Sequence, residues 1–295
     1  MKSILKNAQY ILEALVVKIA ILFFRILGYK RSSNIAAKIA IFIGRKLAVN
    51  KLADNNLSNA MPHLSKKHRD DILHDMWDNL GRIVGEYYHI NNMSKDDFDK
   101  ILIYSDNFKK NIEVLKKSKK GGIIMTGHIG NWEIGPRTLM SQGLKSSVIY
   151  RPLNNPYVEK ITAAMRDANL IKKSASGNRK IIEAIKNGEY VVIMADQKVS
   201  EGEPVKFFHE DVMTATSIAR IALKYDVPII PARVIRLKSK HEFMIDMDEP
   251  LQKNNENIKK DLEVIDFTAT INRKLEFWIK EFPDQWFWVH NRWKK

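Results

Sequence analysis

Gly121-Gly-Ile-Ile-Met-Thr-Gly-His-Ile-Gly-Asn-Trp-Glu-Ile-Gly135 is the stretch of the chain that decides its fold. The residues from Ile123 to Thr126 favour β-structure and are bounded by glycines, so they predict a short buried strand. His128 follows that strand in a loop that we expect to open the next helix, and we expect Glu133, five residues later, in the first turn of that helix. On one straight helix the two side chains would point about 140° apart, at roughly 3.6 residues per turn. They can therefore meet only if His128 lies in the loop, where glycines permit a close approach.

A histidine paired in this way would have its far nitrogen held by the Glu133 carboxylate. Its near nitrogen would then be able to take a proton from a substrate. The same spacing also fits a loop histidine beside an acid that caps a helix, so the spacing alone does not decide between the two interpretations.

Strand and helix patterns alternate along the rest of the chain after residue 121. Strands are predicted at 146–150, 190–195, 228–237 and 242–247, and helices at 157–169, 178–187, 214–225 and 257–281. This alternation predicts an α/β fold with a mainly parallel central sheet flanked by helices. We see no clear linker, so we expect one catalytic domain at 51–295, preceded by an N-terminal attachment at 1–50.

Polar residues follow three of the predicted strands. They are His128, the triplet Tyr150-Arg151-Pro152 and the triplet Ala195-Asp196-Gln197. In parallel α/β sheets, binding sites lie at the carboxyl ends of the strands. Arg151, together with Arg166 in the next predicted helix, suits bidentate binding of phosphate or carboxylate, although a surface ion pair is an alternative for each. Asp196 is either a site residue or a residue that caps a turn.

The composition indicates a folded protein with an anionic partner. Hydrophobic residues make up 45% of the 295 residues, the formal net charge is +15, and cysteine is absent, which excludes a cysteine nucleophile and thiolate metal sites. The charge is compatible with nucleic acid, acidic lipid or an acidic carrier protein.

The first 51 residues favour acidic lipid over nucleic acid. They combine many basic residues with the single acid Glu13 and long aliphatic stretches, which is typical of segments at an anionic membrane surface. The chain shows no helix-turn-helix pattern and no basic segment with aromatic stacking platforms. Residues 4–27 predict a helix that is either a tilted single-pass anchor or a helix lying in the membrane interface, and 32–50 predict a second, amphipathic helix.

Several motifs resemble those of one enzyme family. The His128-x4-Glu133 block resembles the glycerolipid acyltransferase superfamily. Tyr150-Arg151-Pro152, Arg166, Asp196-Gln197, Val205-Lys-Phe-Phe208, Thr214-Ala-Thr216 and the terminal Pro283-Asp-Gln-Trp-Phe-Trp-Val-His-Asn-Arg-Trp293 narrow it to the lipid A biosynthesis acyltransferases, the late lauroyl/myristoyl transferases. The resemblance covers roughly residues 10 to 293. His209 and Glu210 depart from it, because the family commonly has glycine there.

The resemblance implies a reaction and a set of site residues. A fatty acyl chain would pass from acyl carrier protein to a hydroxyl of a Kdo-lipid A precursor, at the cytoplasmic face of the inner membrane. His128 and Glu133 would be the catalytic dyad, and Arg151, Arg166 and Asp196 would bind substrate. We expect no cofactor. Backbone N–H groups at Gly127 and Gly130 are candidate donors to the oxyanion.

Three other functions remain open from the sequence. One is an acyltransferase of the same superfamily that acts on another glycolipid or lysophospholipid with acyl-CoA. Another is a basic binding protein without catalysis. The third is a metal-dependent hydrolase, although no His-Glu-x-x-His ligand set occurs.

Overall fold

A computed structural model describes residues 2–166, 168–252 and 260–293 of the chain. Its centre is a seven-stranded sheet in the order β1-β9-β8-β2-β5-β3-β4. The strands β8, β2, β5, β3 and β4 run parallel, β9 pairs antiparallel with β8, and β1 pairs parallel with β9. The predicted α/β fold with a mainly parallel sheet is therefore confirmed. The strands are β1 Leu102–Tyr104, β2 Gly122–Thr126, β3 Ser146–Tyr150, β4 Asn169–Lys172, β5 Tyr190–Met194, β8 Ile229–Arg236 and β9 Phe243–Met247.

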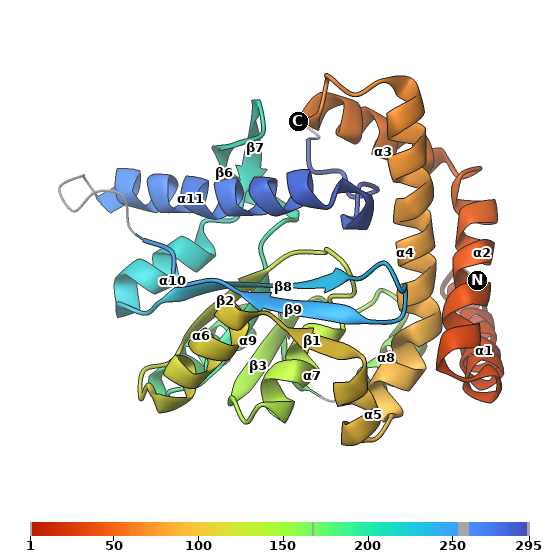
Figure 1. The fold of residues 1–295 in the computed structure, drawn as a ribbon, viewed down its shortest axis with the longest axis horizontal. Helices are drawn as coiled ribbons and strands as arrows, with labels where there is room; N and C mark the ends of the chain where they lie inside the picture. Colours follow the sequence, from red (N-terminus) through yellow and green to blue (C-terminus); the bar gives the residue numbers. More distant parts are fainter. Residues whose placement is uncertain (1, 167, 253–259, 294–295) are drawn as a thin grey trace.

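Alternating side chains of the central strands pack into two apolar cores, one on each face of the sheet. Ile123 and Val191 belong to one core, whereas their neighbours Ile124 and Val192 belong to the other, as a period of two requires. The first core packs against α9 (Ala175–Lys186), α10 (Ser217–Tyr225) and α11 (Lys260–Glu281). The second packs against α5 (Lys95–Lys100), α6 (Asp106–Lys117) and α7 (Ile134–Ser141). Figure 1 shows α11 on one side of the sheet and α6 and α7 on the other.

The segment predicted as one helix at 157–169 divides into two elements. The helix α8 spans Pro156–Met165, and β4 begins at Asn169. Strand β4 lies at the edge of the sheet, where a single neighbour, β3, suffices to hold polar residues such as Asn169 and Lys172 in an extended conformation. The predicted helix at 257–281 begins within residues that lie outside the described part of the chain.

A second, two-stranded sheet consists of β6 (Lys198–Phe207) and β7 (Glu210–Thr214). It packs against α11, and the two residues of its turn are Phe208 and His209. Phe208 adopts a left-handed φ of 55°, and its N–H donates to Oε1 of Glu276. His209, one of the two residues at which the motif departs from glycine, is the second residue of this turn.

Four helices stack at one end of the sheet (Figure 1). They are α1 (Lys2–Leu27), α2 (Tyr29–Gly44), α3 (Ala48–Ala60) and α4 (Lys66–Asn92), so the second predicted helix ends earlier than residue 50. Helix α2 lies close against α4, because Gly81 and Gly85 leave room for the backbone of α2 at Ala36 and Ser32. Within the described residues, no helix is both long and apolar enough to cross a bilayer.

Candidate active site

His128 and Asp196 meet because their strands are neighbours in the sheet. Strands β2 and β5 pair in parallel with Thr126 opposite Met194, so the second residue beyond each strand is His128 in one case and Asp196 in the other. The distance from Nδ1 of His128 to Oδ1 of Asp196 is 2.8 Å. The other oxygen, Oδ2, accepts from the backbone N–H of His128 at 2.7 Å and from Nε1–H of Trp286 at 2.9 Å.

These contacts fix the tautomer of the histidine. An ionised carboxylate only accepts hydrogen bonds, so the proton of the neutral imidazole is on Nδ1 and the lone pair is on Nε2. Burial alone would raise the pKa of Asp196, but the charge of His128 and the hydrogen bonds outweigh it and hold the pKa well below its usual range. Burial would lower the pKa of His128, yet the charge and hydrogen bond of Asp196, followed by the charge of Glu133, raise it above its ordinary value.

Glu133 has a different partner from the one that we predicted. Its two oxygens accept from Nε and NH2 of Arg166, at 3.0 and 2.7 Å. The expected contact between Glu133 and the far nitrogen of His128 was therefore wrong, and Asp196 makes that contact instead. The physical reason is that α7 begins only at Ile134, so Glu133 lies at the position before the helix rather than in its first turn, whereas β5 brings Asp196 directly beside β2.

The loop between β2 and α7 is held by its own polar groups. Gly130 has a left-handed φ of 57°, and a Cβ there would lie 1.9 Å from the carbonyl oxygen of Val234. The N–H of Gly130 donates to the carbonyl of Gln285, so this group is already used and does not serve the oxyanion as we had expected. The buried Asn131 accepts from the N–H of Glu133 through Oδ1 and donates through Nδ2 to Oε2 of Glu86.

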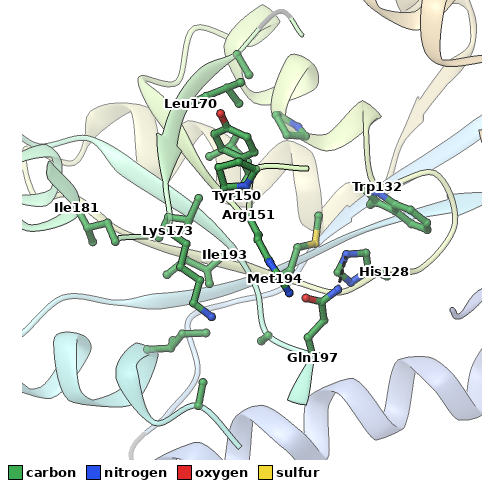
Figure 2. A pocket seen from close by; sticks show the side chains of 18 of the residues that line it. His128, Trp132, Tyr150, Arg151, Leu170, Lys173, Ile181, Ile193, Met194 and Gln197 are labelled. Carbon is green, nitrogen blue, oxygen red and sulfur yellow. Dashed lines mark hydrogen bonds between the residues drawn. The ribbon is translucent and has the colours of Figure 1, made fainter. Parts of the chain in front are cut away.

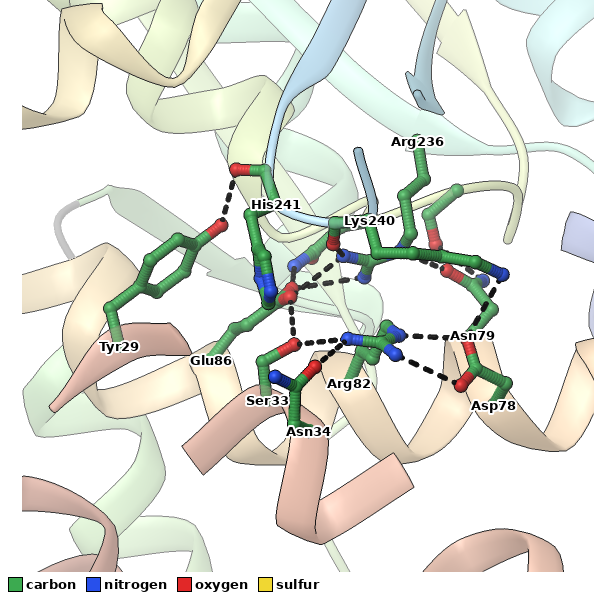
Figure 3. A network of polar contacts seen from close by, with 12 residues as sticks. Tyr29, Ser33, Asn34, Asp78, Asn79, Arg82, Glu86, Arg236, Lys240 and His241 are labelled. Carbon is green, nitrogen blue, oxygen red and sulfur yellow. Dashed lines mark hydrogen bonds and ion pairs between the residues drawn. The ribbon is translucent and has the colours of Figure 1, made fainter. Parts of the chain in front are cut away.

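Glu86 belongs to a buried polar network behind the loop, shown in Figure 3. It forms an ion pair with Arg236, at the end of β8, with N–O distances of 2.7 and 2.9 Å. Its Oε1 also accepts from Ser33 of α2. Arg236 in turn donates to Oδ1 of Asn79, so α2, α4, β8 and the loop are tied together at one buried carboxylate. The network fixes the backbone that carries His128 and Glu133.

The catalytic candidates open onto a cavity of about 650 Å³. Figure 2 shows His128, Trp132 and Gln197 at one end of it, with Arg151 and Lys173 extending from the ends of β3 and β4. The Nε2 atoms of Gln197 and His128 are 3.4 Å apart. The apolar part of the wall comes mainly from β3, β5, α9 and α10, through Val148, Ile149, Ile181, Ile193, Ile218 and Ile221. The cavity therefore suits a ligand with an apolar chain and an anionic head.

The sequence interpretation missed several residues of this site. Trp286 holds Asp196, and it is buried together with Trp288 and Trp293, so these tryptophans pack in the interior. Gln197 was quoted beside Asp196 in the sequence motif but was given no role of its own. Glu86 and Arg236 are 150 residues apart in the chain, and no local pattern pairs them. Among the described residues, no group of three potential metal ligands converges.

The site thus combines a histidine held by a carboxylate at the strand ends of an α/β sheet with a cavity that has an apolar wall and cationic residues at its rim. This combination is suited to general-base chemistry on a substrate with an apolar chain. The chain matches the family model described as "Bacterial lipid A biosynthesis acyltransferase" over residues 2–295, and it belongs to that family. It is 22% identical over 270 residues to the lipid A biosynthesis acyltransferase of Haemophilus influenzae, an alignment that covers 88% of this chain and 81% of that protein. The protein is therefore an acyltransferase of the lipid A biosynthesis family.

Proposed function

We propose that the enzyme transfers a fatty acyl chain from acyl carrier protein to a hydroxyl of a Kdo-lipid A precursor, with His128 as the general base. The observation that carries this proposal is the bond from Nδ1–H of His128 to Asp196, which leaves the lone pair of Nε2 at the cavity. A base of this kind needs no serine or cysteine, because the hydroxyl of the acceptor is the nucleophile.

The reaction then proceeds in two steps. The acceptor oxygen attacks the carbonyl carbon of the donor thioester while Nε2 of His128 takes the hydroxyl proton. The tetrahedral oxyanion collapses, the carbon–sulfur bond breaks, and the leaving thiolate takes the proton back from the imidazolium. The products are an ester and a free thiol. The side-chain amide of Gln197, 3.4 Å from Nε2, is placed to donate to the oxyanion.

The two carboxylates have separate roles in this proposal. Asp196 is a positioning residue that fixes the tautomer of His128 and stabilises the imidazolium. Glu133 lines the cavity, contributes its charge to His128 and holds the guanidinium of Arg166 in place. It remains a candidate for direct contact with substrate, as do Arg151 and Arg166.

We further propose that the protein attaches to an anionic membrane through its first 50 residues, at the cytoplasmic side of the inner membrane. Large apolar side chains of α1 are exposed at helical spacing, among them Leu12, Leu15, Ile19, Leu22 and Ile26, at 52–76% of their surface. Exposed cations, Lys18 and Arg25, lie on the same helix. Helix α1 is fixed beside the mouth of the cavity, because Asn155, just after β3, donates to Tyr10 and Glu13.

Vesicle flotation tests the attachment. The wild-type protein should float with phosphatidylglycerol vesicles, and a Leu15→Asp/Ile19→Asp variant should remain in the dense fraction. Val114→Asp is the matched control, because Val114 is as exposed as Ile19, at 59%, but lies on α6. Equal flotation of all three proteins would exclude α1 as the attaching surface.

The second candidate function is transfer from acyl-CoA to another glycolipid or lysophospholipid, which the same base and cavity would serve. The enzyme would be incubated with tetra-acylated Kdo-lipid A and either acyl carrier protein thioesters or acyl-CoA, and the lipid would be analysed by mass spectrometry. We expect one added acyl chain from the carrier-protein donor, its loss in His128→Ala, and its retention in His63→Ala, an exposed histidine outside the site. Transfer from acyl-CoA alone, or to lysophospholipid alone, would favour the second candidate.

A further inference from the structure

Arg151 and Lys173 are side-by-side cations at the rim of the cavity. Strands β3 and β4 pair in parallel with Tyr150 opposite Lys172, so the next residue of each strand, Arg151 and Lys173, occupies a matching position. The N–H of Lys173 donates to the carbonyl of Tyr150, which continues the ladder to this point. Neighbouring strands lie about 4.8 Å apart, and both side chains line the same cavity (Figure 2).

Most other cations of the cavity already have partners. Arg166 is neutralised by both oxygens of Glu133, and Arg137 donates to the carbonyls of Ile90 and Met93. By contrast, the side chains of Arg151 and Lys173 make no hydrogen bond or ion pair with the residues that the structure describes. Two adjacent, unpaired cations repel each other, and an anion between them removes that repulsion.

We propose that Arg151 and Lys173 form a binding site for the phosphate group of a substrate, a proposal that rests on the proposed acyl transfer. A guanidinium binds two phosphate oxygens through its planar pair of N–H groups, and an ammonium adds a point charge on a flexible stem. Arg166, which the sequence had suggested for this task, is already occupied by Glu133. The apolar wall at Ile149 and Ile193 is formed by β3 and β5, beside the two cations. A phosphate bound at the rim would therefore leave this wall free to contact a fatty chain.

Two substrates carry phosphate of suitable chemistry. One is the sugar phosphate of the acceptor lipid, and the other is the phosphodiester of the phosphopantetheine arm of the donor. The shared ligand chemistry is an alkyl phosphate next to an apolar chain, and the experiment has to separate its two sources.

Calorimetry on the full-length protein tests the site without catalysis. Glucosamine 1-phosphate is titrated into the wild type and the Arg151→Gln and Lys173→Gln variants, with unphosphorylated glucosamine as the reference. Lys172→Gln and Arg179→Gln are the matched controls, because both side chains are exposed neighbours on β4 and α9 outside the cavity lining. We expect each site variant to weaken binding by about tenfold or more, the effect of losing one charged hydrogen bond, and the controls to bind as the wild type does. Equal binding of the two sugars, or equal losses in the controls, would overturn the proposal.

Steady-state kinetics then identify the source of the phosphate. Lys173→Gln should raise KM for the substrate whose phosphate the site holds, with little change in kcat. That effect should vanish either with enzymatically dephosphorylated acceptor or with acyl-pantetheine in place of acyl-phosphopantetheine. An unchanged KM for both substrates would refute a substrate-phosphate site even if glucosamine 1-phosphate binds. A wild type that transfers no acyl group would instead count against the proposed function, and the calorimetry would still decide the site.

Discussion

Replacement of Asp196 by asparagine should convert the imidazole of His128 to the wrong tautomer, with little change in the shape of the site. Two donors, the N–H of His128 and Nε1–H of Trp286, meet at the position of Oδ2, so the amide oxygen of the asparagine is held there. The amide nitrogen then takes the position of Oδ1, 2.8 Å from Nδ1 of His128. Because an amide nitrogen only donates, Nδ1 must accept, and the ring proton moves to Nε2, where it faces the hydroxyl that it should deprotonate.

The expected loss in kcat is about 10³–10⁴-fold, up to the roughly 10⁴-fold loss that the same change causes in a serine-protease triad. At about 1.4 kcal/mol for each factor of ten, this equals roughly 4–5.5 kcal/mol of transition-state stabilisation. Urea denaturation should show a fold that is retained, because all three hydrogen bonds to residue 196 are kept, the one to Nδ1 of His128 with its direction reversed. Glu133→Gln, which leaves the bond from His128 to Asp196 intact, should cost less.

The pH profile gives a second measure of the same pair. A general base acts in its neutral form, so kcat/KM of the wild type should fall as the pH falls through the pKa of His128, which Asp196 holds above its ordinary value. Removing that charge lowers the pKa, so the residual activity of Asp196→Asn should fall only at lower pH. The reasoning is refuted if Asp196→Asn keeps more than about a tenth of the activity while Glu133→Gln is as inactive as His128→Ala, since Glu133 would then be the partner of the base.

Three further changes test the cavity and its support. Ile218→Trp should fill part of the cavity beside α10, so that kcat/KM becomes highest for shorter acyl donors. Ile218→Ala should instead extend the preference to longer donors. An unchanged preference in both variants would place the acyl chain elsewhere. Gly130→Ala should destabilise the protein by more than Gly143→Ala in urea denaturation, because both glycines have positive φ but only at Gly130 does a Cβ meet a neighbour, the carbonyl of Val234. Arg236→Met should lower the free energy of unfolding by about 3–5 kcal/mol, because the buried Glu86 is left without its ion-pair partner, and Glu86→Leu in addition should restore part of that loss. A double variant no more stable than the single one would contradict this account.

The sequence predicted the elements of the site better than their arrangement. Strand β3 was found at its exact ends, and β5, β8 and β9 within a residue or two, because runs of β-branched residues between turn residues are a local signal. The short strand β1 and the polar strand β4 were missed, since each owes its extended conformation to one neighbour in the sheet rather than to its own side chains.

The partner of His128 could not be predicted from the sequence alone. Glu133 is close in the chain, and the spacing drew attention to it, while Asp196 is 68 residues away. The two strands that bring Asp196 to His128 are adjacent only because β5 inserts between β2 and β3 in the sheet, an order that no local pattern records. The same holds for Arg151 and Lys173, whose proximity depends on the register of the pair β3–β4.

The N-terminal helices are coupled to the site through direct contacts. Ser33 of α2 donates to Glu86 of α4, and Glu86 accepts from Asn131 in the loop that carries His128. Arg82 of α4 donates to Ser33 and Asn34, so removal of residues 1–50 would leave both Arg82 and Glu86 with unfilled hydrogen bonds. The proposed division into an attaching segment and a catalytic domain at residue 50 is thus a division of function rather than of folding. A chain that begins at residue 51 should lose activity through displacement of the loop, even towards a water-soluble acceptor that needs no membrane.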